Sequence, residues 1–363
     1  MKRRIAPLLT LLCLLVSLAG CDLLSAAPPD SGTPSAAPVT DGSTLAVHFI
    51  DVGQADSALL VCGDDAMLID GGNVADSSLV VSYLDQQGID QLDYVVCTHA
   101  HEDHVGGLSG PLNTCTVSHV LSPVTQYDSK AFENFVKYTE AQGLEPEIPN
   151  PGDTFDLGEA QVTILGPVAE YSETNNTSIV LRVDFGATSF LFTGDMETKA
   201  EKDLLDQGAD LSATVLKVGH HGSDTSTSYS FLREVMPEYA VISVGLDNDY
   251  GHPSDDVLSR LRDAGATVYR TDQQGTIVAV SDGTTVTFTT EKDTAPTPGR
   301  DGQTSPQPSQ SESAQETYIG NLNSKVFHRE DCPNLPAEQN RIIFSSREEA
   351  VEAGYTPCGN CKP

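Results

Sequence analysis

The stretch that decides the fold is Cys97-Thr98-His99-Ala100-His101-Glu102-Asp103-His104-Val105-Gly106-Gly107. It places three imidazoles and the Asp103 carboxylate within six residues. Residues 92–97 are apolar and partly β-branched, which predicts a buried strand, and the paired glycines predict a turn after the cluster. The cluster therefore belongs to a loop at the end of a strand, where a rigid scaffold can direct several side chains to one point.

The side chains of this loop are of the kinds that bind divalent metal ions. Imidazole nitrogen and carboxylate oxygen suit zinc and related ions. We expect His99 and His101 to bind one ion, and Asp103 and His104 to bind a second. A surface loop that is rich in histidine without a functional reason is the alternative, and the further loops described next argue against it.

Two later strands also end in loops that carry candidate ligands. Phe192-Thr193-Gly194-Asp195 closes an apolar strand, so the Asp195 carboxylate could bridge two ions; as a preferred capping residue, it could instead begin the helix expected over 197–207. The strand expected over 214–218 leads to His220 and His221. Because adjacent residues point in different directions, we expect one of these two histidines to be a ligand, and the sequence leaves open which.

Three other histidines lie outside these loops. His252 follows the strand expected over 240–244 and precedes a proline and a helix. It could contact substrate or donate a proton to a leaving group, with a plain turn residue as the alternative. His48 and His119 lie inside strand patterns, and we expect both to be buried or half-buried.

Alternating strands and helices indicate a layered α/β architecture. Strands are predicted at 45–50, 58–61, 66–69, 92–97, 117–121, 161–165, 178–185, 189–193, 214–218, 240–244, 267–270 and twice near 275–290. Helices with apolar residues at three- and four-residue spacing are predicted at 76–87, 130–142, 197–207, 228–235 and 254–264.

The N-terminus has the pattern of a targeting segment. A basic region at residues 2–4 precedes an apolar run at 8–16 that is short for a bilayer span. Leu18-Ala19-Gly20-Cys21 resembles the lipobox of bacterial lipoproteins, which implies a signal peptide over 1–20 and a lipid on Cys21 that anchors the chain to a membrane. An ordinary secretory signal is the alternative. Residues 21–44 are expected to form a flexible tether.

The composition limits the classes of partner. A formal net charge of −32 gives the chain no general electrostatic attraction to nucleic acid or anionic membranes, while a hydrophobic content of 39% suffices for a sizeable core. Residues 292–316 are rich in Pro, Gln, Ser and Thr, so we expect a disordered linker there. The linker separates a large domain at 45–291 from a small one at 317–363.

Together, the motifs of the large domain resemble those of the metallo-β-lactamase superfamily, and within it the soluble domain of ComEC-type DNA-uptake proteins. The resemblance is carried by residues 49–57, 68–72, 99–107, 175–178, 192–195, 217–223 and 250–253. It implies an αββα sandwich over residues 45–291, with a site for two divalent ions, zinc or manganese, at one edge.

One position departs from the pattern of the wider superfamily, most of whose members carry a further metal-binding histidine before the bridging aspartate. Asn175 and Asn176 stand there instead, as in ComEC-like proteins. An amide oxygen is a poor zinc ligand but suits harder ions. Both asparagines are therefore candidates for a weak metal contact or a substrate contact, and Ser223 is a further candidate for contact with phosphate.

The C-terminal segment has the spacing of a structural zinc site. His328 and Cys332 are followed after a long gap by Cys358 and Cys361. So short a segment cannot bury much core, and a closed four-ligand zinc site would substitute for it; a Cys358–Cys361 disulfide is the alternative. The segment resembles the metal-binding module of the Ada DNA-repair protein, whose four ligands are cysteines. Histidine at 328 disfavours methyl-acceptor chemistry and favours a structural or DNA-touching role.

The sequence as a whole predicts a lipid-anchored, extracytoplasmic hydrolase with two divalent ions. Such a centre activates water and stabilises a developing oxyanion. We expect a phosphodiesterase or nuclease that acts on DNA, with Asp103 and His252 as catalytic residues. Hydrolysis of a small phosphoester or lipid headgroup is the rival activity, and a non-catalytic DNA receptor is the rival from another class. No protein partner can be inferred.

Overall fold

The computed structural model describes residues 42–299, 317–329, 332–344, 347–359 and 361. The predicted signal peptide, the lipid-bearing Cys21, nearly all of the tether and most of the linker lie outside these residues. Within the described ranges, no helix has both the length and the apolar character needed to cross a bilayer.

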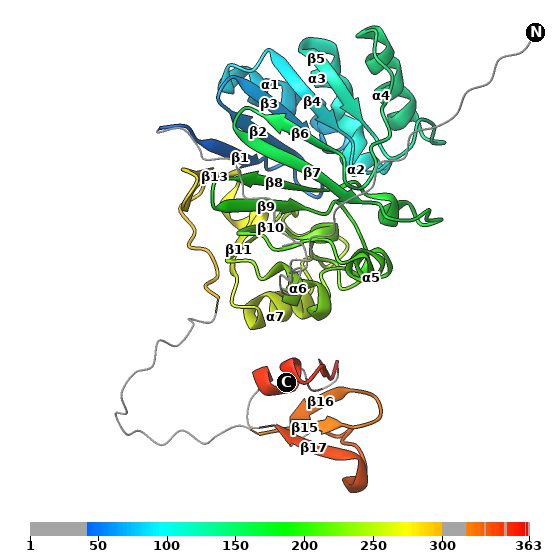
Figure 1. Cartoon of the computed structure of the whole chain (residues 1–363), viewed down its shortest axis with the longest axis vertical. Coiled ribbons are helices and arrows are strands. Elements are labelled where there is room, and N and C mark those ends of the chain that lie inside the picture. Colours follow the sequence, from blue (N-terminus) through cyan, green and yellow to red (C-terminus); the bar gives the residue numbers. More distant parts are fainter. Residues whose placement is uncertain (1–41, 300–316, 330–331, 345–346, 360, 362–363) are drawn as a thin grey trace, which may run out of the picture. The chain divides into compact units, whose positions relative to one another are not determined.

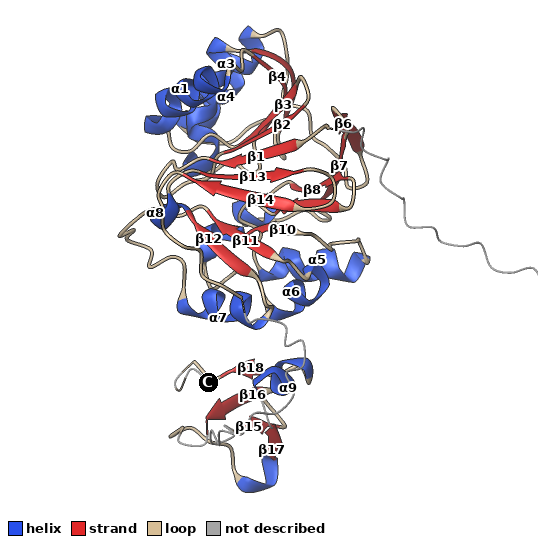
Figure 2. Ribbon diagram, turned by 90° about the vertical axis from the view of Figure 1, so that its left-hand side faces the viewer, coloured by secondary structure: helices blue, strands red, loops and turns tan. Residues whose placement is uncertain are grey.

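Two seven-stranded mixed sheets form the centre of the large domain (Figures 1 and 2). The first sheet has the order β14-β13-β1-β2-β3-β4-β5, and the second has the order β12-β11-β10-β9-β8-β7-β6. The first consists of β1 (Leu45–Phe49), β2 (Ala58–Cys62), β3 (Asp65–Ile69), β4 (Gln91–Val96), β5 (Thr116–Leu121), β13 (Ile277–Ser281) and β14 (Val286–Thr290). The second consists of β6 (Thr154–Leu157), β7 (Ala160–Gly166), β8 (Val180–Phe185), β9 (Thr188–Phe192), β10 (Val215–Lys217), β11 (Tyr239–Ile242) and β12 (Thr267–Arg270).

Helices cover the outer face of each sheet. On the first sheet these are α1 (Ser77–Gln87), α3 (Ser109–Thr114) and α4 (Lys130–Ala141), and on the second they are α5 (Thr198–Gln207), α6 (Tyr229–Val235) and α7 (Asp255–Asp263). A separate core lies between the sheets, where Phe49 of the first meets Phe192 of the second with ring centroids 6.0 Å apart. This three-core arrangement confirms the predicted αββα sandwich.

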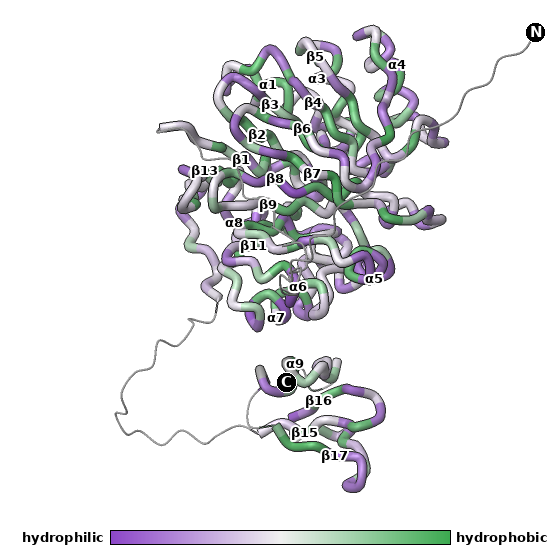
Figure 3. The backbone as a smooth tube through the Cα atoms, in the orientation of Figure 1, coloured by the Kyte–Doolittle hydropathy of each residue, from purple (hydrophilic) through white to green (hydrophobic). Residues whose placement is uncertain are grey.

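The sequence explains why these elements form where they do. Strand β9 is buried at all five positions, as expected for a strand covered on both faces. Helices α4, α6 and α7 are each preceded by a serine N-cap, Ser129, Ser228 or Ser254, whose hydroxyl accepts a backbone N–H of the first turn. Hydrophobic and hydrophilic residues alternate along α4 and α7 (Figure 3), which gives each helix one face for its sheet.

The predicted elements agree with the structure to within a few residues, with specific exceptions. Strand β6 and the short helices α2 (Glu102–Val105), α3 and α8 (Thr271–Gln274) were not predicted, because segments this short carry little periodicity. His48 is buried, as expected, but the prediction for His119 was wrong. Its side chain is 48% exposed, because β5 lies at the edge of the first sheet and His119 stacks on Tyr94 at the surface.

The C-terminal module has its own four-stranded sheet in the order β17-β15-β16-β18. Its elements are β15 (Tyr318–Asn321), β16 (Val326–Arg329), β17 (Arg341–Phe344), α9 (Arg347–Glu352) and β18 (Thr356–Pro357). The buried core among its described residues is small: Tyr318, Phe327, Phe344, Ala350 and Tyr355. So small a core needs additional stabilisation.

Close backbone contact holds the His-rich loop in place. Gly71 donates its N–H to the His104 carbonyl at 2.8 Å, and Gly107 donates to the Gly72 carbonyl at 2.9 Å. A Cβ atom on Gly107 would lie only 1.9 Å from the Gly71 carbonyl oxygen. Glycine is therefore required by the space available at position 107.

We expect Gly107→Ala to lower the free energy of unfolding of the large domain by about 1–3 kcal/mol, the usual cost of forcing an extra methyl group into a packed site. Urea denaturation would measure the change, with Asn113→Ala on the exposed face of α3 as the control. Equal stability of the Gly107→Ala variant and the unmodified protein would contradict the close packing described here.

Candidate metal centre

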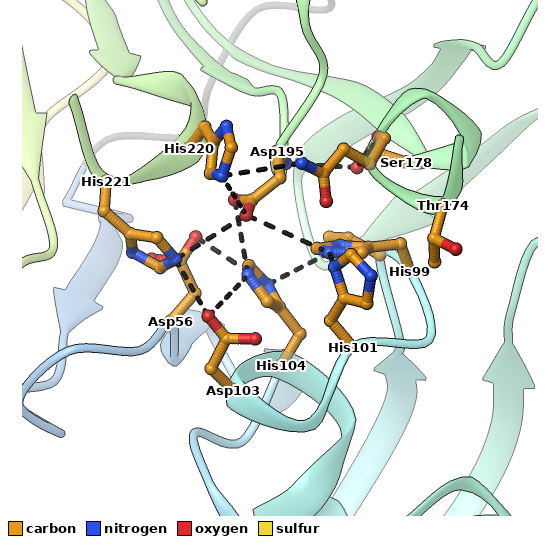
Figure 4. Close-up of polar contacts among 12 residues, drawn as sticks. Asp56, His99, His101, Asp103, His104, Thr174, Ser178, Asp195, His220 and His221 are labelled. Carbon is orange, nitrogen blue, oxygen red and sulfur yellow. Dashed lines mark hydrogen bonds and ion pairs between the residues drawn. The ribbon is translucent and has the colours of Figure 1, made fainter. Parts of the chain in front are cut away.

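The candidate site lies where the carboxyl ends of parallel strands from both sheets meet. Strands β3 and β4 run parallel in the first sheet, and β9, β10 and β11 run parallel in the second. The loops that follow these strands carry the candidate ligands. Figure 4 shows their side chains gathered around Asp195.

One group contains Asp103, His104, Asp195 and His221, whose ligand atoms all lie within 4.8 Å of one another. His104 Nε2 is 3.3 Å from Asp195 Oδ1, and His221 Nε2 is 3.3 Å from Asp103 Oδ2. His104, Asp195 and His221 are buried, while Asp103 is partly open to solvent. Two imidazoles and two carboxylates in this arrangement suit one divalent ion.

Hydrogen bonds fix the orientation of both histidines in this group. His104 Nδ1 lies 2.8 Å from Asp70 Oδ2, and His221 Nδ1 lies 3.0 Å from the Ser243 carbonyl oxygen. A carbonyl oxygen only accepts, so Nδ1 of His221 carries the proton. In the neutral ring the lone pair is then on Nε2, which faces the group. Such outer partners typically orient metal-binding histidines.

Asp70 is held by the residue before the His-rich cluster. Its two carboxylate oxygens accept from the Thr98 N–H at 2.8 Å and from the Thr98 hydroxyl at 2.7 Å. The Thr98 oxygen also lies 3.3 Å from His99 Nδ1. Since that hydroxyl proton goes to Asp70, the Thr98 oxygen can accept the proton of His99 Nδ1. The lone pair of the neutral His99 ring is then on Nε2, which faces Asp195.

Asp56 and Lys217 form a buried ion pair beside the group. Lys217 Nζ lies 2.7 Å from Asp56 Oδ2, and the two side chains are only 5% and 7% exposed. Asp56 Oδ1 is also 3.2 Å from His221 Nδ1. This lysine, together with the neighbouring histidines, holds the pKa of Asp56 far below its usual range despite burial. Asp56 therefore stays charged and supports the His221 ring.

A second, smaller group contains His99 and His101. Their Nε2 and Nδ1 atoms converge at 3.1 Å, and Asp195 Oδ2 lies 3.9 Å from His99 Nε2. Asp195 therefore faces both groups: its Oδ1 lies near His104, and its Oδ2 lies near both His99 and His221. It does not cap the following helix, because the N-cap position of α5 is occupied by Glu197.

The two asparagines have different surroundings. Asn176 accepts the Glu197 N–H through its Oδ1 at 3.1 Å, so it supports the start of α5. Asn175 instead lies at the edge of the site, where its Nδ2 donates to Glu197 Oε1 at 3.2 Å. Its Oδ1 is buried and finds no hydrogen-bond partner within the described part of the chain. Of the pair, Asn175 is the one available for a metal or substrate contact.

The adjacent histidines both approach Asp195. His220 Nε2 and His221 Nε2 each lie 3.7 Å from Asp195 Oδ2. Both residues have left-handed backbone angles, with φ of 51° and 52°, so the chain turns sharply enough to direct both rings inward. The expectation that adjacent side chains must diverge does not hold for this turn.

His252 and Ser223 border the site. The His252 ring centroid lies 5.7 Å from that of His220, and its Nδ1 is buried without a hydrogen-bond partner among the described residues. Burial, helped by the nearby His220, lowers the pKa of His252. The Ser223 hydroxyl is buried and lies 3.0 Å from that of Thr225.

The residues fit a divalent metal centre on two grounds. Three buried atoms that face the site find no hydrogen-bond partner in the described chain: His104 Nε2, Asp195 Oδ1 and His221 Nε2. The charges at the site also favour a bound cation. Burial by itself lowers the pKa of His221, yet the nearby carboxylates of Asp195 and Asp56 raise it to about 10, so these carboxylates attract positive charge. Divalent ions would supply that positive charge.

Sequence reasoning did not assign roles to Asp56, Asp70 or Lys217. The first two stand in the segments 49–57 and 68–72 that carry the family resemblance, Asp56 in the loop between two predicted strands and Asp70 directly after one, and that position was the available signal. Lys217 begins the segment 217–223, which also carries the resemblance, but a lysine at the end of a strand is normally exposed and so gave no sign of burial.

The C-terminal module gathers its predicted ligands in one place. The ligand atoms of His328, Cys332, Cys358 and Cys361 all lie within 4.8 Å of one another. Cys332, Cys358 and Cys361 form no disulfide with one another in the described structure, so the alternative Cys358–Cys361 disulfide is not present here. Burial, together with the neighbouring Cys332 and Cys358 sulfurs, raises the pKa of Cys361 to about 12. Three thiols and an imidazole form a closed set that suits zinc.

Comparison with known proteins agrees with both halves of this description. Residues 50–245 match the family described as the metallo-beta-lactamase superfamily, and residues 307–363 match the metal binding domain of Ada.

Relatives of the large domain include three curated bacterial proteins. ComE operon protein 3 of Bacillus subtilis is 33% identical over 250 residues, which is 64% of this chain and 32% of the relative. Competence protein ComA of Neisseria gonorrhoeae is 32% identical over 234 residues, with the same two coverages. Recombination protein 2 of Haemophilus influenzae is 30% identical over 243 residues, 64% of this chain and 28% of the relative. The chain thus spans about a third of the length of these relatives.

We expect the C-terminal module to fold only around zinc, because its four ligands replace a self-sufficient core. A zinc chelator applied to the full chain should make residues 317–363 sensitive to protease, while the sandwich resists. Mass spectrometry of the fragments would measure this, with the chelator pre-saturated with zinc as the control. Protection of the module in chelator and reductant together would show that zinc is not required.

Proposed function

The chain belongs to the metallo-beta-lactamase superfamily, and on that basis we propose that its large domain is a two-ion phosphodiesterase that acts on DNA. The observation that carries the proposal is the position of Asp195. One of its oxygens faces His104 and the other faces His99, so a single buried carboxylate joins two groups of metal-binding side chains. Paired-ion sites of this kind are common in enzymes that hydrolyse phosphate esters.

The proposal of DNA as substrate is supported by the relatives. The names of two of them refer to competence and to recombination, and recombination is a process of DNA. The region that matches the superfamily, residues 50–245, includes both groups of metal-binding side chains but not His252. An Ada-type metal-binding domain on the same chain, named after a DNA-repair protein, agrees with this proposal.

Each residue of the site would have a defined task. Two divalent ions in such a centre supply activation of water and stabilisation of the negative charge that develops on phosphate. Asp103 would bind the second ion and orient the attacking water through its partly exposed carboxylate. His252 would contact the substrate or protonate the leaving group, and Ser223 and the neighbouring loop amides would hold phosphate oxygens.

The electrostatics around the site favour a substrate that offers one phosphate at a time. Lys217 is paired with Asp56, and Arg260 donates to backbone carbonyls of the loop 224–227. Neither cation is therefore free for a DNA backbone. Because the binding of long duplexes relies on many phosphate contacts, we propose single strands or strand ends as the DNA substrate.

A small phosphoester or a lipid headgroup is the second candidate substrate. The observation that favours it is the acidic border of the site, which repels a long polyanion such as DNA more than a small substrate. Glu197 Oε1 lies 3.6 Å from His220 Nδ1, and the exposed Asp224 and Asp249 are close in sequence to His221 and His252. A non-catalytic receptor for DNA is a third candidate, which any metal-dependent turnover excludes.

The setting of the enzyme is also a proposal. We place it outside the cytoplasm, held to the membrane by a lipid on Cys21, with hydrolase limits at 45–291, a linker at 292–316 and the zinc module at 317–363. Labelling with a radioactive fatty acid, lost in Cys21→Ala, would test the anchor.

Hydrolysis of single-stranded DNA and of bis-p-nitrophenyl phosphate, with zinc and with manganese, tests the proposed activity. Asp103→Ala should abolish turnover of both substrates. His252→Ala should lower kcat on DNA by about 10²–10⁴-fold if it is the general acid, with metal content unchanged. The control is His119→Ala, which alters an exposed histidine of β5. If neither single-stranded DNA nor bis-p-nitrophenyl phosphate is hydrolysed in the presence of metal, the proposal is contradicted.

Tyr250 gives a test for recognition of nucleobases. Its ring is 74% exposed and stacks on His252, with centroids 5.7 Å apart and planes at 25°. Stacking of a base on an aromatic ring contributes about 1–3 kcal/mol, so Tyr250→Leu should lower kcat/KM on single-stranded DNA about 5- to 100-fold, and Tyr250→Phe should not.

The loss should disappear on an oligonucleotide that carries abasic sites, because no base is left to stack. Tyr138→Leu, which changes a half-buried tyrosine of α4, is the matched control. An equal loss on normal and abasic DNA would show that Tyr250 acts through the loop and not through the base.

A further inference from the structure

The two groups around Asp195 are unequally provided with histidines. The group of Asp103, His104 and His221 supplies two imidazoles and a carboxylate of its own. The other group has only His99 and His101 besides the shared Asp195. Catalytic sites for such ions usually have three protein ligands in addition to water. With the shared Asp195, the smaller group has three protein ligands, one fewer than the other group, so a further donor would let it hold an ion comparably well.

We propose that His220 is this donor, so that the adjacent histidines His220 and His221 bind one ion each. The inference rests on the two-ion centre proposed above but not on the identity of the substrate. It assigns His220 a role different from that of a substrate contact.

The position of the His220 ring supports this assignment. Its Nε2 lies 3.7 Å from Asp195 Oδ2, the same oxygen that lies 3.9 Å from His99 Nε2. His99 and His220 come from different sheets and face one carboxylate oxygen, as Figure 4 shows. His221 Nε2 also lies 3.7 Å from this oxygen, but His221 already belongs to the group of Asp103 and His104, which leaves His220 as the histidine that can complete the smaller group.

The hydrogen bonds of the ring leave its Nε2 with a lone pair. Nδ1 of His220 lies 3.1 Å from the Thr225 hydroxyl and 3.6 Å from Glu197 Oε1. Since the Thr225 hydroxyl donates to Glu197, its oxygen can accept the proton of Nδ1. His104 and His221 are oriented in the same way by Asp70 and Ser243, so all three rings present Nε2 to the centre.

The surroundings of Asn175 support the same tautomer. Its Nδ2, which can only donate, lies 3.5 Å from His220 Nε2. Its Oδ1 is buried and has no hydrogen-bond partner among the described residues. The Asn175 atom next to the His220 lone pair is thus Nδ2, while Oδ1 remains an oxygen donor at the edge of the site. Oxygen and nitrogen donors together suit manganese as well as zinc.

The backbone is built to bring both rings inward. His220 and His221 have φ of 51° and 52°, a conformation that costs about 1–3 kcal/mol per residue and persists only when its surroundings enforce it. The His220 N–H donates to the Gly194 carbonyl at 3.1 Å, and Ser223 donates to the His220 carbonyl at 2.8 Å. The first bond ties the histidine turn to the loop that carries Asp195. Strain at two consecutive histidines is consistent with both having a function.

Manganese binding to the full chain tests the inference. Mn²⁺ is chosen because thiolates prefer softer ions, so that the C-terminal cysteines compete little. Equilibrium dialysis would count the bound ions, and electron paramagnetic resonance would show whether they form a coupled pair. The unmodified protein should bind two coupled ions.

In His220→Ala and in His220→Gln, we expect one ion to bind as before and the other to bind more than about 100-fold more weakly, since even outer partners of ligands change affinity about 10–100-fold. The spectrum should then be that of an isolated ion. His252→Ala, which removes the ring next to His220, should retain two coupled ions and is the matched control. Circular dichroism would confirm that the variants are folded.

Two coupled ions bound with unchanged affinity in both folded His220 variants would overturn the inference, and His220 would then be a substrate contact. This result differs from failure of the proposed function. In that case the unmodified protein would bind two ions and hydrolyse no phosphodiester, or would bind only one.

Discussion

Burial of the Asp195 carboxylate is the constraint on which the rest of the site depends. The residue is 2% exposed, and an isolated charge so deep in a protein is strongly unfavourable. Imidazole nitrogens from two sheets lie within 4 Å of its oxygens. Neutral imidazoles alone do not balance the charge, whereas divalent ions do. The buried Asp195 carboxylate thus requires nearby cations, and it lies among the imidazoles that are able to bind them.

The neighbouring carboxylates do not compete for the same role, because each has a different partner. Asp56 is neutralised by Lys217, and Asp70 is held by Thr98 and His104. Loss of one member of such a buried pair would leave the other uncompensated, which is far more costly than loss of an exposed pair. The interior polar network therefore stabilises the fold and orients the metal-binding rings at the same time.

The two parts of the chain use metal chemistry for different purposes. In the large domain, three packed cores stabilise the sandwich, and the histidine and aspartate cluster lies at one edge with Asp103 partly exposed. In the C-terminal module, a small core accompanies a closed set of three cysteines and one histidine. Thiolate-rich sites select softer ions than imidazole and carboxylate sites do. One chain can therefore hold a structural zinc ion and a different catalytic metal.

The sequence by itself determined the elements of the sandwich, the His-rich loop and the clustering of His328 with three cysteines. These depend on local periodicity and on ligand spacing, which a single chain displays directly. Only the tertiary structure showed that Asp56, Asp70 and Lys217 join the site, because their partners lie far away in sequence. It also showed that His119 is exposed, since the order of strands in a sheet is not a local property. The inward direction of both His220 and His221 follows from a left-handed turn that contacts with the Asp195 loop help to hold, and no propensity of histidine would predict it.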